Sequence, residues 1–436
     1  MQLIINNRVY TDNSKEADVN SVFVVSKQNE KYKDLAIANG CKELVDAKDL
    51  KNHLDMSSIK VIGITGTNGK TTTAAAIYSI LLDLGYKVAL QGTRGFFINE
   101  TRVEEYSLTT PVQLGNFAHI QKAMENGCNF FVMEVSSHAI EQGRIEGLEF
   151  ALKVHTNITR DHLDYHKTIE EYVRVKNSFL SDETPKLINK DDPVVKYNVK
   201  NGFAYSLEAP STYKVDAYSF KNGTHVMFNH FGKHFSFSSM MMGIFNVYNL
   251  MAAVASVHIT TQRPLEEICE ALEGFGGVSG RMETISTNPL VIVDFAHTPD
   301  GMDEVLKSFN DKEIICVFGA GGDRDKEKRP LMGRVAARYS KHIIVTSDNP
   351  RFEDPDVIIS EIMSGISNHP STQIEINRKE ALKKAIEMAN ENSVVLVLGK
   401  GDESSQIIYD KKFPFSDKEE ILKILKNKGL IKKNGV

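Results

Sequence analysis

The sequence has few cysteines, and their spacing does not suggest a disulfide framework. Its four cysteines are Cys41, Cys128, Cys269 and Cys316, and none of them forms a CxxC pair. Small secreted domains that depend on disulfides are much richer in cysteine, so the sequence indicates a reducing, cytoplasmic setting. The N-terminal stretch MQLIINNRVYTDNSKEADV becomes polar and acidic after a few residues, which is not the pattern of a secretory signal peptide.

Long apolar runs and an excess of basic charge are also absent. No stretch approaches the roughly 18 apolar residues that a membrane-spanning helix needs. The net charge is −5, and the basic residues are scattered rather than gathered in a stripe, which disfavours nucleic-acid binding. The chain has 436 residues, of which 41% are hydrophobic, so it can bury a large core. We therefore expect a soluble monomer whose partners are small molecules, with no nucleic acid and no membrane.

The pattern of apolar runs predicts an α/β protein. Residues 1–58 contain short β-like runs such as Ser21–Val25, and the pattern changes at Lys60. From there KVIGIT, KVALQG, NFFVMEV and LKVHTNI alternate with segments of helical spacing, which predicts a mostly parallel sheet covered on both faces. Near residue 279 another series begins, with strands PLVIVDF, EIICVFG, HIIVTSD and SVVLVLG. We expect this series to form a C-terminal Rossmann-like α/β domain.

Between residues 202 and 239 the apolar and polar residues alternate. The stretch AYSFKNGTHVMFNHFGKHFSFSS, with turns expected at Asn222-Gly223 and near Gly232, predicts an antiparallel β insertion in the central domain. We place the domain boundaries near residues 58 and 278. The three predicted domains are therefore 1–58, 59–278 and 279–436.

A glycine-rich loop, GITGTNGKTTT at residues 63–73, separates the first predicted strand of the central domain from a helix. Gly66 and Gly69 permit backbone angles that other residues resist, so successive N–H groups can point into one concavity. The helix N-terminus and Lys70 add positive charge. Such a loop is typical of nucleotide triphosphate binding, so we expect ATP or GTP here, with Mg²⁺ on a threonine hydroxyl. The residues expected to hold them are Gly66, Thr67, Asn68, Gly69, Lys70, Thr71 and Thr72.

This loop departs from the usual pattern at one position. Ile64 stands where G-x-x-x-x-G-K-[ST] has its first glycine, so a plain glycine turn before a helix is the alternative interpretation. The order of strand, loop, lysine and threonine favours phosphate binding. It does not indicate what is done with the nucleotide.

Polar side chains follow two further strands of the central domain. Glu134 lies near the end of NFFVMEVSSH, and His162 follows LKVHTNI. In a parallel sheet both strands end at the same edge as the glycine loop, and ligands bind at that edge. We therefore predict Glu134 and His162 as Mg²⁺ ligands, although either alone could be an ordinary surface or core residue. Lys176 lies in the amphipathic segment EEYVRVKNSFL, where spacing alone suggests a solvated lysine.

Several motifs together make the chain similar to a known family. They occur in the order TGTNGKTTT, MEVSSHAIEQGR, TNITRDHLDYH, YVRVK, FNVYNLMAA, GRME, VDFAHTPD, GGDRDKEKRP, SDNPR and GKGDE. This set resembles the Mur ligase family, which implies a UDP-sugar domain, an ATP domain and a domain that brings the incoming amino acid. It also implies a reaction of peptidoglycan precursor synthesis. The γ-carboxylate of UDP-N-acetylmuramoyl-L-alanyl-D-glutamate attacks the γ-phosphate of ATP, and an amino group then displaces phosphate from the acyl phosphate.

The resemblance also implies roles for individual residues. In such ligases the counterpart of Lys176 is carbamylated, which makes it a carboxylate ligand of Mg²⁺ and replaces the interpretation as a solvated lysine. The residues implied as catalytic are Lys70, Glu134, His162 and Lys176. The nucleotide is expected to meet Asn246, Asn249, Arg281, Asp294 and His297. The UDP-muramoyl-dipeptide is expected to meet Ser14 through its uridine half, and Thr109, Thr110, Ser136, Gln142 and Arg144.

The motif SDNPR bears on the choice of amino acid. The family's meso-diaminopimelate enzymes carry DNPR, and its lysine enzymes carry a different sequence there. Diaminopimelate has one more carboxylate than lysine, and arginine can hold a carboxylate through two parallel N–H bonds. The residues expected to bind it are Arg324, Asp348, Asn349, Pro350, Arg351, Gly399 and Glu403, with Glu403 near the distal ammonium. The alternative is that DNPR is only an Asx-Pro turn before a helix.

Other functions compete with this interpretation. A lysine-adding Mur ligase or a folylpolyglutamate synthase-like ligase would use the same acyl-phosphate chemistry, and the latter lacks the DNPR arrangement. A P-loop regulatory NTPase would bind the nucleotide and switch a partner. A catalytically dead binding module is disfavoured because all four residues implied as catalytic are present.

Overall fold

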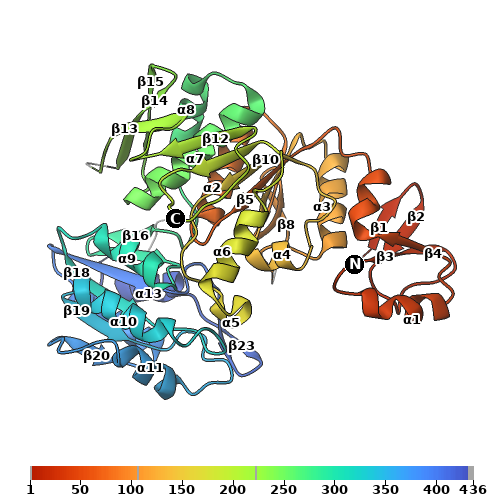
Figure 1. The fold of residues 1–436 in the computed structure, drawn as a ribbon. Helices are drawn as coiled ribbons and strands as arrows, with labels where there is room; N and C mark the ends of the chain where they lie inside the picture. The colour runs from red at the N-terminus through yellow and green to blue at the C-terminus, as the bar shows by residue number, and fades with distance from the viewer. Residues whose placement is uncertain (1, 106–107, 221–222, 431–436) are drawn as a thin grey trace. The chain divides into compact units, whose positions relative to one another are not determined.

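The computed structural model describes residues 2–105, 108–220 and 223–430, and the chain divides into two compact units (Figure 1). The first unit consists of Met1–Ile158, Glu170–Ser239 and Asn246–Gly276. The second consists of Thr159–Ile169, Met240–Phe245 and Gly277–Val436. The short segment Thr159–Ile169 therefore groups with the C-terminal part of the chain, although it follows a strand of the first unit directly in the sequence.

A small sheet opens the first unit. Its strands are β1 (Gln2–Ile5), β2 (Arg8–Thr11), β3 (Ser21–Val25) and β4 (Glu43–Asp46), connected by η1 (Glu30–Tyr32) and α1 (Lys33–Ala38) and followed by η2 (Ala47–Asn52). They lie in chain order, with β1 antiparallel to β2 and the other pairs parallel. The strand predicted at Ser21–Val25 is confirmed, and its Val22 and Phe23 are fully buried. Leu3 of β1 joins the same apolar cluster as Phe117, so this sheet shares a core with the rest of the unit.

A larger sheet forms the centre of the first unit, in the order β15-β14-β13-β12-β11-β10-β5-β9-β6-β7-β8. Its strands are β5 (Lys60–Thr65), β6 (Val88–Gly92), β7 (Gly95–Ile98), β8 (Thr101–Glu104), β9 (Phe130–Glu134), β10 (Phe150–His155), β11 (Lys186–Asn189), β12 (Gly202–Ser206), β13 (Tyr213–Ser219), β14 (Thr224–His230) and β15 (Lys233–Ser239). Neighbours are parallel from β6 to β13. The carboxyl ends of β5, β9 and β10 therefore meet at one edge, as predicted. β5 is buried from Val61 to Thr65, as a strand covered on both faces must be.

Helices of the first unit supply the rest of its core. They are α2 (Lys70–Asp83), α3 (Gln113–Glu125), α4 (Ser137–Glu141), α6 (Ile169–Ser178), α7 (Ile244–Thr261) and α8 (Leu265–Glu273), with the first residues of α6 and α7 assigned to the second unit. α2 buries Ile77, Ile80 and Leu81, as their helical spacing predicted. Gly85 follows its end with a φ of +85°, which is the backbone region that glycine adopts most readily.

α7 has the length and composition of a membrane-spanning helix, with a mean hydropathy of 1.2 over 18 residues. This differs from the expectation that no stretch would be so apolar. However, 67% of that window is buried inside the protein, and Leu250 and Met251 have no exposed surface. Burial of these apolar side chains inside the protein accounts for the composition of the helix.

Residues 202–239 differ in part from the predicted antiparallel insertion. β12 pairs in parallel with both β11 and β13 and so continues the main sheet, whereas β14 is antiparallel to β13 and to β15. Alternation of apolar and polar residues indicates one buried face, and it does not indicate the direction of the neighbouring strand. The turn near Gly232 is confirmed because His230 pairs with Lys233, whereas Asn222 of the other expected turn lies outside the described residues. At the opposite edge the antiparallel pairing of β7 and β8 was not predicted.

The second unit is built on a sheet in the order β16-β17-β21-β18-β19-β20. Its strands are β16 (Glu283–Thr287), β17 (Leu290–Asp294), β18 (Glu313–Phe318), β19 (His342–Val345), β20 (Thr372–Ile374) and β21 (Ser393–Leu398), and β22 (Ser405–Ile408) pairs with β23 (Lys411–Pro414) in a separate hairpin. Only β16 is antiparallel to its neighbour among the strands of the six-stranded sheet, which confirms the predicted α/β pattern.

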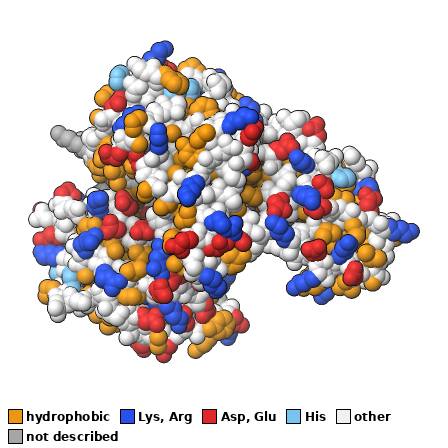
Figure 2. Space-filling model, viewed as in Figure 1, with side chains coloured by type: hydrophobic (Ala, Val, Ile, Leu, Met, Phe, Trp, Pro, Cys, Tyr) orange, Lys and Arg blue, Asp and Glu red, His pale blue; other side chains and the backbone are white. Residues whose placement is uncertain are grey.

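Helices cover both faces of this second sheet. They are α9 (Pro299–Lys307), α10 (Lys328–Tyr339), α11 (Pro355–Met363), α12 (Arg378–Met388) and α13 (Asp417–Asn427). One apolar cluster joins the sheet to α9, α10 and α11, and another joins it to α12 and α13. On the surface shown in Figure 2, acidic and basic side chains are interspersed, in agreement with their scattered positions in the sequence.

Candidate active site

The glycine loop lies at the carboxyl end of β5 and leads directly into α2. A Cβ atom on Gly66 would lie 1.8 Å from the Thr156 hydroxyl oxygen, and one on Gly69 would lie 2.2 Å from Oδ1 of Asn249. Gly69 also has a φ of +83° and caps the N-terminus of α2. Both glycines are therefore required by close packing, and Gly69 also by its backbone angle. The loop forms the compact turn at a helix N-terminus that phosphate groups bind.

Side chains from the end of β10 hold the shape of this loop. The Thr156 hydroxyl donates to the carbonyl of Asn68 at 2.6 Å. The Asn157 side chain accepts from the backbone N–H of Asn68 at 2.9 Å and donates to its carbonyl at 3.2 Å. The Lys70 ammonium lies over the loop and donates to the carbonyls of Gly66 and Thr67, each at 2.7 Å. Hydrogen bonds from Thr156 and Asn157 thus set the loop geometry, and the Lys70 cation lies within the loop.

Glu134 ends β9 beside the first turn of α2. Its Oε2 accepts a hydrogen bond from the Thr71 hydroxyl at 3.0 Å, and its Oε1 accepts one from the backbone N–H of Thr93 at 2.9 Å. Gly92 allows this approach, because a Cβ there would lie 2.2 Å from Oε1 of Glu134. The structure therefore brings together Thr71 and Glu134, two of the residues predicted to bind a metal. Thr93 was not predicted, although it follows the parallel strand β6, and the rule that identified Glu134 applies equally to it.

Lys176 is buried beneath the glycine loop. Its side chain is 1% exposed, and its ammonium donates to the carbonyl of Gly66 at 2.8 Å and to the Thr65 hydroxyl at 3.4 Å. The ring of Tyr172 lies one helical turn away, 5.1 Å from the Lys176 nitrogen, and its hydroxyl is 2.9 Å from that of Thr67. The interpretation of Lys176 as a solvated lysine is therefore wrong, because the polar face of α6 expected from spacing packs against the loop at this position.

His162 belongs to the second unit, so its pairing with Glu134 stays a prediction. It precedes α5 (Leu163–His166) with a φ of +54°, and its Nε2 lies 3.4 Å from Oδ2 of Asp161. Burial would raise the pKa of Asp161, but the charges of His162, His297 and Lys328 outweigh it and hold that pKa at about 2. One electrostatic cluster of the second unit thus contains Asp161, His162, His297 and Lys328.

The residues expected around the nucleotide lie in both units. In the first, Asn249 contacts the glycine loop at Gly69 and donates through Nδ2 to Oδ1 of Asn246 at 3.1 Å. In the second, Asp294 ends β17 and accepts hydrogen bonds from the N–H groups of Met282 and Ala296, while burial raises its pKa. Burial also lowers the pKa of His297 to about 4, so this imidazole is neutral near pH 7. The Arg281 guanidinium lies 4.2 Å from the centre of the Phe295 ring.

Most of the residues expected to hold the sugar-linked substrate form one cluster in the first unit. Arg144 donates to the carbonyl of Thr110 at 2.8 Å and to Oε1 of Gln142 at 2.9 Å. The Thr110 hydroxyl accepts from the N–H of Ser136 at 3.1 Å, and the hydroxyl of Thr109 lies 3.2 Å from that of Thr93. Gln28, in the turn after β3, donates to Gln142 at 2.7 Å and was not predicted. Ser14 is buried, and no contact among the described residues joins it to this cluster.

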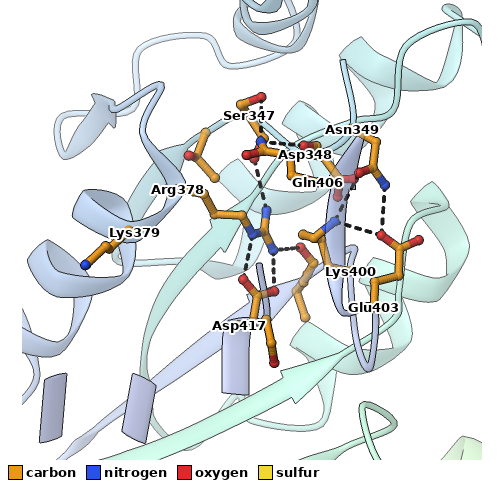
Figure 3. A network of polar contacts seen from close by, with 12 residues as sticks. Ser347, Asp348, Asn349, Arg378, Lys379, Lys400, Glu403, Gln406 and Asp417 are labelled. Carbon is orange, nitrogen blue, oxygen red and sulfur yellow. Dashed lines mark hydrogen bonds and ion pairs between the residues drawn. The ribbon is translucent and has the colours of Figure 1, made fainter. Parts of the chain in front are cut away.

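Three of the residues expected to bind the amino acid lie in one polar network at an edge of the second sheet, namely Asp348, Asn349 and Glu403 (Figure 3). Asn349, after β19, donates to Oε2 of Glu403, after β21, at 2.8 Å. A Cβ on Gly399 would lie 2.7 Å from Oδ2 of Asp348, so glycine permits that carboxylate to lie beside it. Asp348 and Asn349 lie in the segment between β19 and α11. This segment is therefore part of a side-chain network and not merely an Asx-Pro turn.

The third loop at this edge is GGDRD. Arg351 donates to the carbonyl of Gly322 at 2.7 Å, and a Cβ on Gly322 would lie 1.9 Å from the carbonyl oxygen of Pro350. Burial and the nearby charge of Arg324 lower the pKa of Arg351, while Asp348 and Glu403 oppose that shift. Motifs far apart in the sequence thus place two arginines and two carboxylates within electrostatic reach of one another.

Comparison with known proteins identifies the family of the chain. The family model described as Mur ligase middle domain matches residues 64–257, and that described as Mur ligase, glutamate ligase domain matches residues 280–401. The chain is 52% identical over 415 residues to the UDP-N-acetylmuramoyl-L-alanyl-D-glutamate--2,6-diaminopimelate ligase of Wolinella succinogenes, covering 95% of each chain. It is 50% identical over 418 residues to the protein of the same name in Helicobacter hepaticus, covering 93% of this chain and 90% of that one.

Solved structures show the same similarity. A structure of a UDP-N-acetylmuramoyl-L-alanyl-D-glutamate--2,6-diaminopimelate ligase aligns with a TM-score of 0.67 at 27% identity, covering 96% of this chain and 95% of that chain. A folylpolyglutamate synthase of Mycobacterium tuberculosis complexed with ADP and AMPPCP also aligns with a TM-score of 0.67, covering 81% of this chain and 91% of that one. At 16% identity, the latter similarity concerns the fold alone.

Proposed function

Since this chain belongs to the Mur ligase family, we propose that it is an ATP-dependent ligase that adds meso-2,6-diaminopimelate to UDP-N-acetylmuramoyl-L-alanyl-D-glutamate. The observation that carries this proposal is the contact between Asn349 and Glu403, because it unites the two motifs expected to recognise the amino acid. The reaction belongs to the synthesis of the peptidoglycan precursor. The identity to relatives of that name, over nearly the whole chain, supports it.

The glycine loop suits the phosphates of ATP. The Lys70 ammonium would exchange the carbonyls of Gly66 and Thr67 for phosphate oxygens as ATP binds, so it would add positive charge where negative charge builds up. The γ-carboxylate of the D-glutamyl residue attacks the γ-phosphorus, ADP leaves, and an acyl phosphate forms. The amine of diaminopimelate attacks the acyl carbon, phosphate leaves, and the nitrogen loses a proton as the amide forms.

Mg²⁺ belongs to this proposal, and the residues present fit it. Among the described residues no three His, Cys, Asp or Glu side chains form a metal-binding group, so the ligands must include other chemistry. Thr71 and Glu134 offer hard oxygen atoms already in contact, and His162 and a carbamate on Lys176 would complete the set. When bound, the ion neutralises charge on the phosphates.

The surroundings of Lys176 support its proposed carbamylation. The reaction joins carbon dioxide to an uncharged amine, and burial of the side chain favours the uncharged form. The amine lies at the carboxyl end of β5, next to the loop that would hold the phosphates. The modified side chain would place a carboxylate there without a second acidic residue in the sequence.

The proposal also covers the organisation of the chain. We assign residues 1–58 to the UDP-sugar, with Ser14 on the uridine half, 59–278 to ATP and 279–436 to the amino acid. The cluster of Thr109, Thr110, Ser136, Gln142 and Arg144 would hold the muramoyl-dipeptide. Closure of the third domain would bring Arg281, Asp294 and His297 to the nucleotide. The enzyme would act as a cytoplasmic monomer, and its four cysteines are free and buried, as a reducing compartment allows.

Release of ADP and the mass of the product test this function. ADP should form only when both the UDP-muramoyl-dipeptide and diaminopimelate are present, and the product should carry diaminopimelate even with lysine in competition. ADP release that ignores both substrates would indicate a regulatory NTPase. A product bearing mainly lysine would assign the chain to the lysine-adding enzymes, and activity on a folate substrate would assign it to the folylpolyglutamate synthases.

A further inference from the structure

A buried lysine lies inside the network that joins the two amino-acid loops. The side chain of Lys400 has no exposed surface, and its ammonium donates to Oε2 of Glu403 at 2.7 Å, to the carbonyl of Ser405 at 2.8 Å and to Oδ1 of Asn349 at 3.2 Å. Figure 3 shows this ammonium between Asn349 and Glu403. These three acceptors match the three protons of an ammonium group.

The contacts of Lys400 set the orientation of both neighbours. Oδ1 of Asn349 also accepts from the N–H of Ile407 at 2.9 Å, so its amide nitrogen must face Glu403. Oε2 of Glu403 is thereby occupied from within the protein by an ammonium and an amide. No hydrogen bond or ion pair among the described residues involves Oε1 of Glu403, and this side chain is 37% exposed. One carboxylate oxygen is held, and the other remains for a ligand.

A second buried cation fixes the two loops that carry this pair. The Arg378 guanidinium is fully buried and binds both oxygens of Asp417, at 2.7 and 2.8 Å. It also donates to the carbonyl of Leu398 at 3.0 Å and to that of Ser347 at 3.4 Å. These carbonyls directly precede Gly399 and Asp348, so Arg378 ties together the starting points of both loops. Lys400 then joins the loops a few residues further along.

We propose that Lys400 is a specificity-determining positioning residue, whose ammonium pairs with Glu403 so that the pocket selects an amino acid with a zwitterionic end over one with a lone ammonium. This inference rests on the proposed ligase function. The distal end of diaminopimelate carries an ammonium and a carboxylate, whereas that of lysine carries only an ammonium. Because Lys400 already balances the charge of Glu403, a lone ammonium gains little from this pocket. The additional carboxylate of diaminopimelate can form ion pairs with the nearby arginine side chains.

The test is the ratio of kcat/KM for diaminopimelate to kcat/KM for L-lysine, at saturating ATP and UDP-muramoyl-dipeptide. In Lys400→Met the uncompensated Glu403 should attract the lysine ammonium, while diaminopimelate loses an oriented partner. An opposite charge within hydrogen-bonding reach changes the equilibrium of a charged group by about tenfold or more. The ratio of kcat/KM for diaminopimelate to that for lysine should therefore fall by at least about tenfold. The KM values for ATP and the nucleotide-sugar should not change. An unchanged ratio in a folded Lys400→Met variant would overturn the inference.

Two further variants keep the test decisive. Lys186→Met is a matched control, since Lys186 is also fully buried and donates to the carbonyls of Asp182 and Lys200 in the first unit. Its effect should be confined to stability, with the substrate ratio unchanged. If Lys400→Met does not fold, Glu403→Gln tests the opposite change of charge. This variant should fold because Glu403 is partly exposed, and it leaves the Lys400 ammonium without its carboxylate partner. The ratio should rise, and a ratio that falls or stays the same would overturn the inference.

The wild-type protein separates the two proposals. If it uses neither amino acid with the nucleotide-sugar, the ligase function fails and this inference fails with it. If it strongly prefers diaminopimelate but the variants retain the wild-type ratio, the ligase function stands and only the role of Lys400 is wrong.

Discussion

The phosphate loop of the first unit and the amino-acid pocket of the second achieve rigidity in different ways. The loop is shaped by close packing at its glycines and by hydrogen bonds from Thr156 and Asn157, and the ammonium groups of Lys70 and Lys176 donate to its carbonyls. The pocket is shaped by buried cations, Lys400 and Arg378, that tie separate loops together. A nucleotide common to many enzymes can be held through its phosphates by one contiguous loop, whereas choosing between two similar amino acids needs charges placed by separate loops. The loop should therefore be sensitive to shape, and the pocket to charge.

Lys176→Ala should have the largest effect, because it removes the buried side chain beneath the loop that is proposed to become a carboxylate ligand of Mg²⁺. We expect kcat to fall by about 10³-fold, since a group that stabilises charge at the reacting phosphate is lost. Steady-state kinetics in the presence of bicarbonate measures this. Short-chain carboxylates should restore part of the activity if a carbamate is the missing group. Unchanged turnover would remove the carbamate from the mechanism.

Arg351→Ala should have the next largest effect and should act on the pocket alone. We expect the KM for diaminopimelate to rise by about 100-fold, because a carboxylate left without its cation in a partly buried site is strongly disfavoured. The KM for ATP should remain as in the wild type. Arg338→Ala, at an exposed arginine of α10 that lies near Asp303, is the matched control and should leave both constants unchanged. Equal losses for ATP and diaminopimelate would mean that the substitution disturbs the fold.

Gly66→Ala tests the dependence of the loop on shape. The added Cβ would overlap the Thr156 hydroxyl, so the loop must shift, and kcat/KM for ATP should fall by about tenfold or more. Gly85→Ala is the control, since Gly85 also has a positive φ but no atom within 4 Å of the added carbon. It should cost only about 1 kcal/mol of stability and leave ATP kinetics intact. Similar kinetic losses in both variants would show that the packing at Gly66 has no special role.

Glu353→Gln should have the smallest effect of these variants, and its effect is on stability. It tests whether the ion pair of Glu353 with Arg329 stabilises the loops around the pocket. Glu353 accepts hydrogen bonds from Arg329, which lower its pKa from 4.5 to about 2, and Arg329 also donates to the carbonyl of Gly321. Because folding lowers the pKa of Glu353, its ionised carboxylate stabilises the folded state fully above about pH 4.5. This stabilisation is lost as the pH falls towards 2. The variant should lose about 1–2 kcal/mol at pH 7 and show a weaker pH dependence in this range, measured by denaturant unfolding.

The exposed pair of Lys341 and Glu313 offers the control for this measurement. Glu313→Gln should change stability little at any pH, because exposed ion pairs contribute little. If Glu313→Gln removes as much of the pH dependence of unfolding as Glu353→Gln does, then the ion pairs near the pocket do not account for the acid sensitivity of the protein.

Prediction from sequence agrees with the structure where residues lie next to one another in the chain or at the ends of neighbouring parallel strands. The glycine loop between β5 and α2 and the position of Glu134 beside it were of this kind, whereas the union of SDNPR with GKGDE was expected from the family resemblance. Thr93 was missed, although the same rule of strand ends identifies it. Lys400 was missed for a different reason. No spacing in GKGDE distinguishes a solvated lysine from one that bonds to Asn349, which is 51 residues away.

The linear order of residues was sufficient to predict the α/β pattern, the glycine loop and the position of Glu134 beside it, because these depend on periodicity, on local backbone freedom and on where parallel strands end. It could not indicate that Lys176, Lys400 and Arg378 are buried, or that β12 continues the parallel sheet. Burial and pairing depend on which distant segments pack together. A charged side chain has the same sequence signature in water and in a core, and packing alone determines which of the two it occupies.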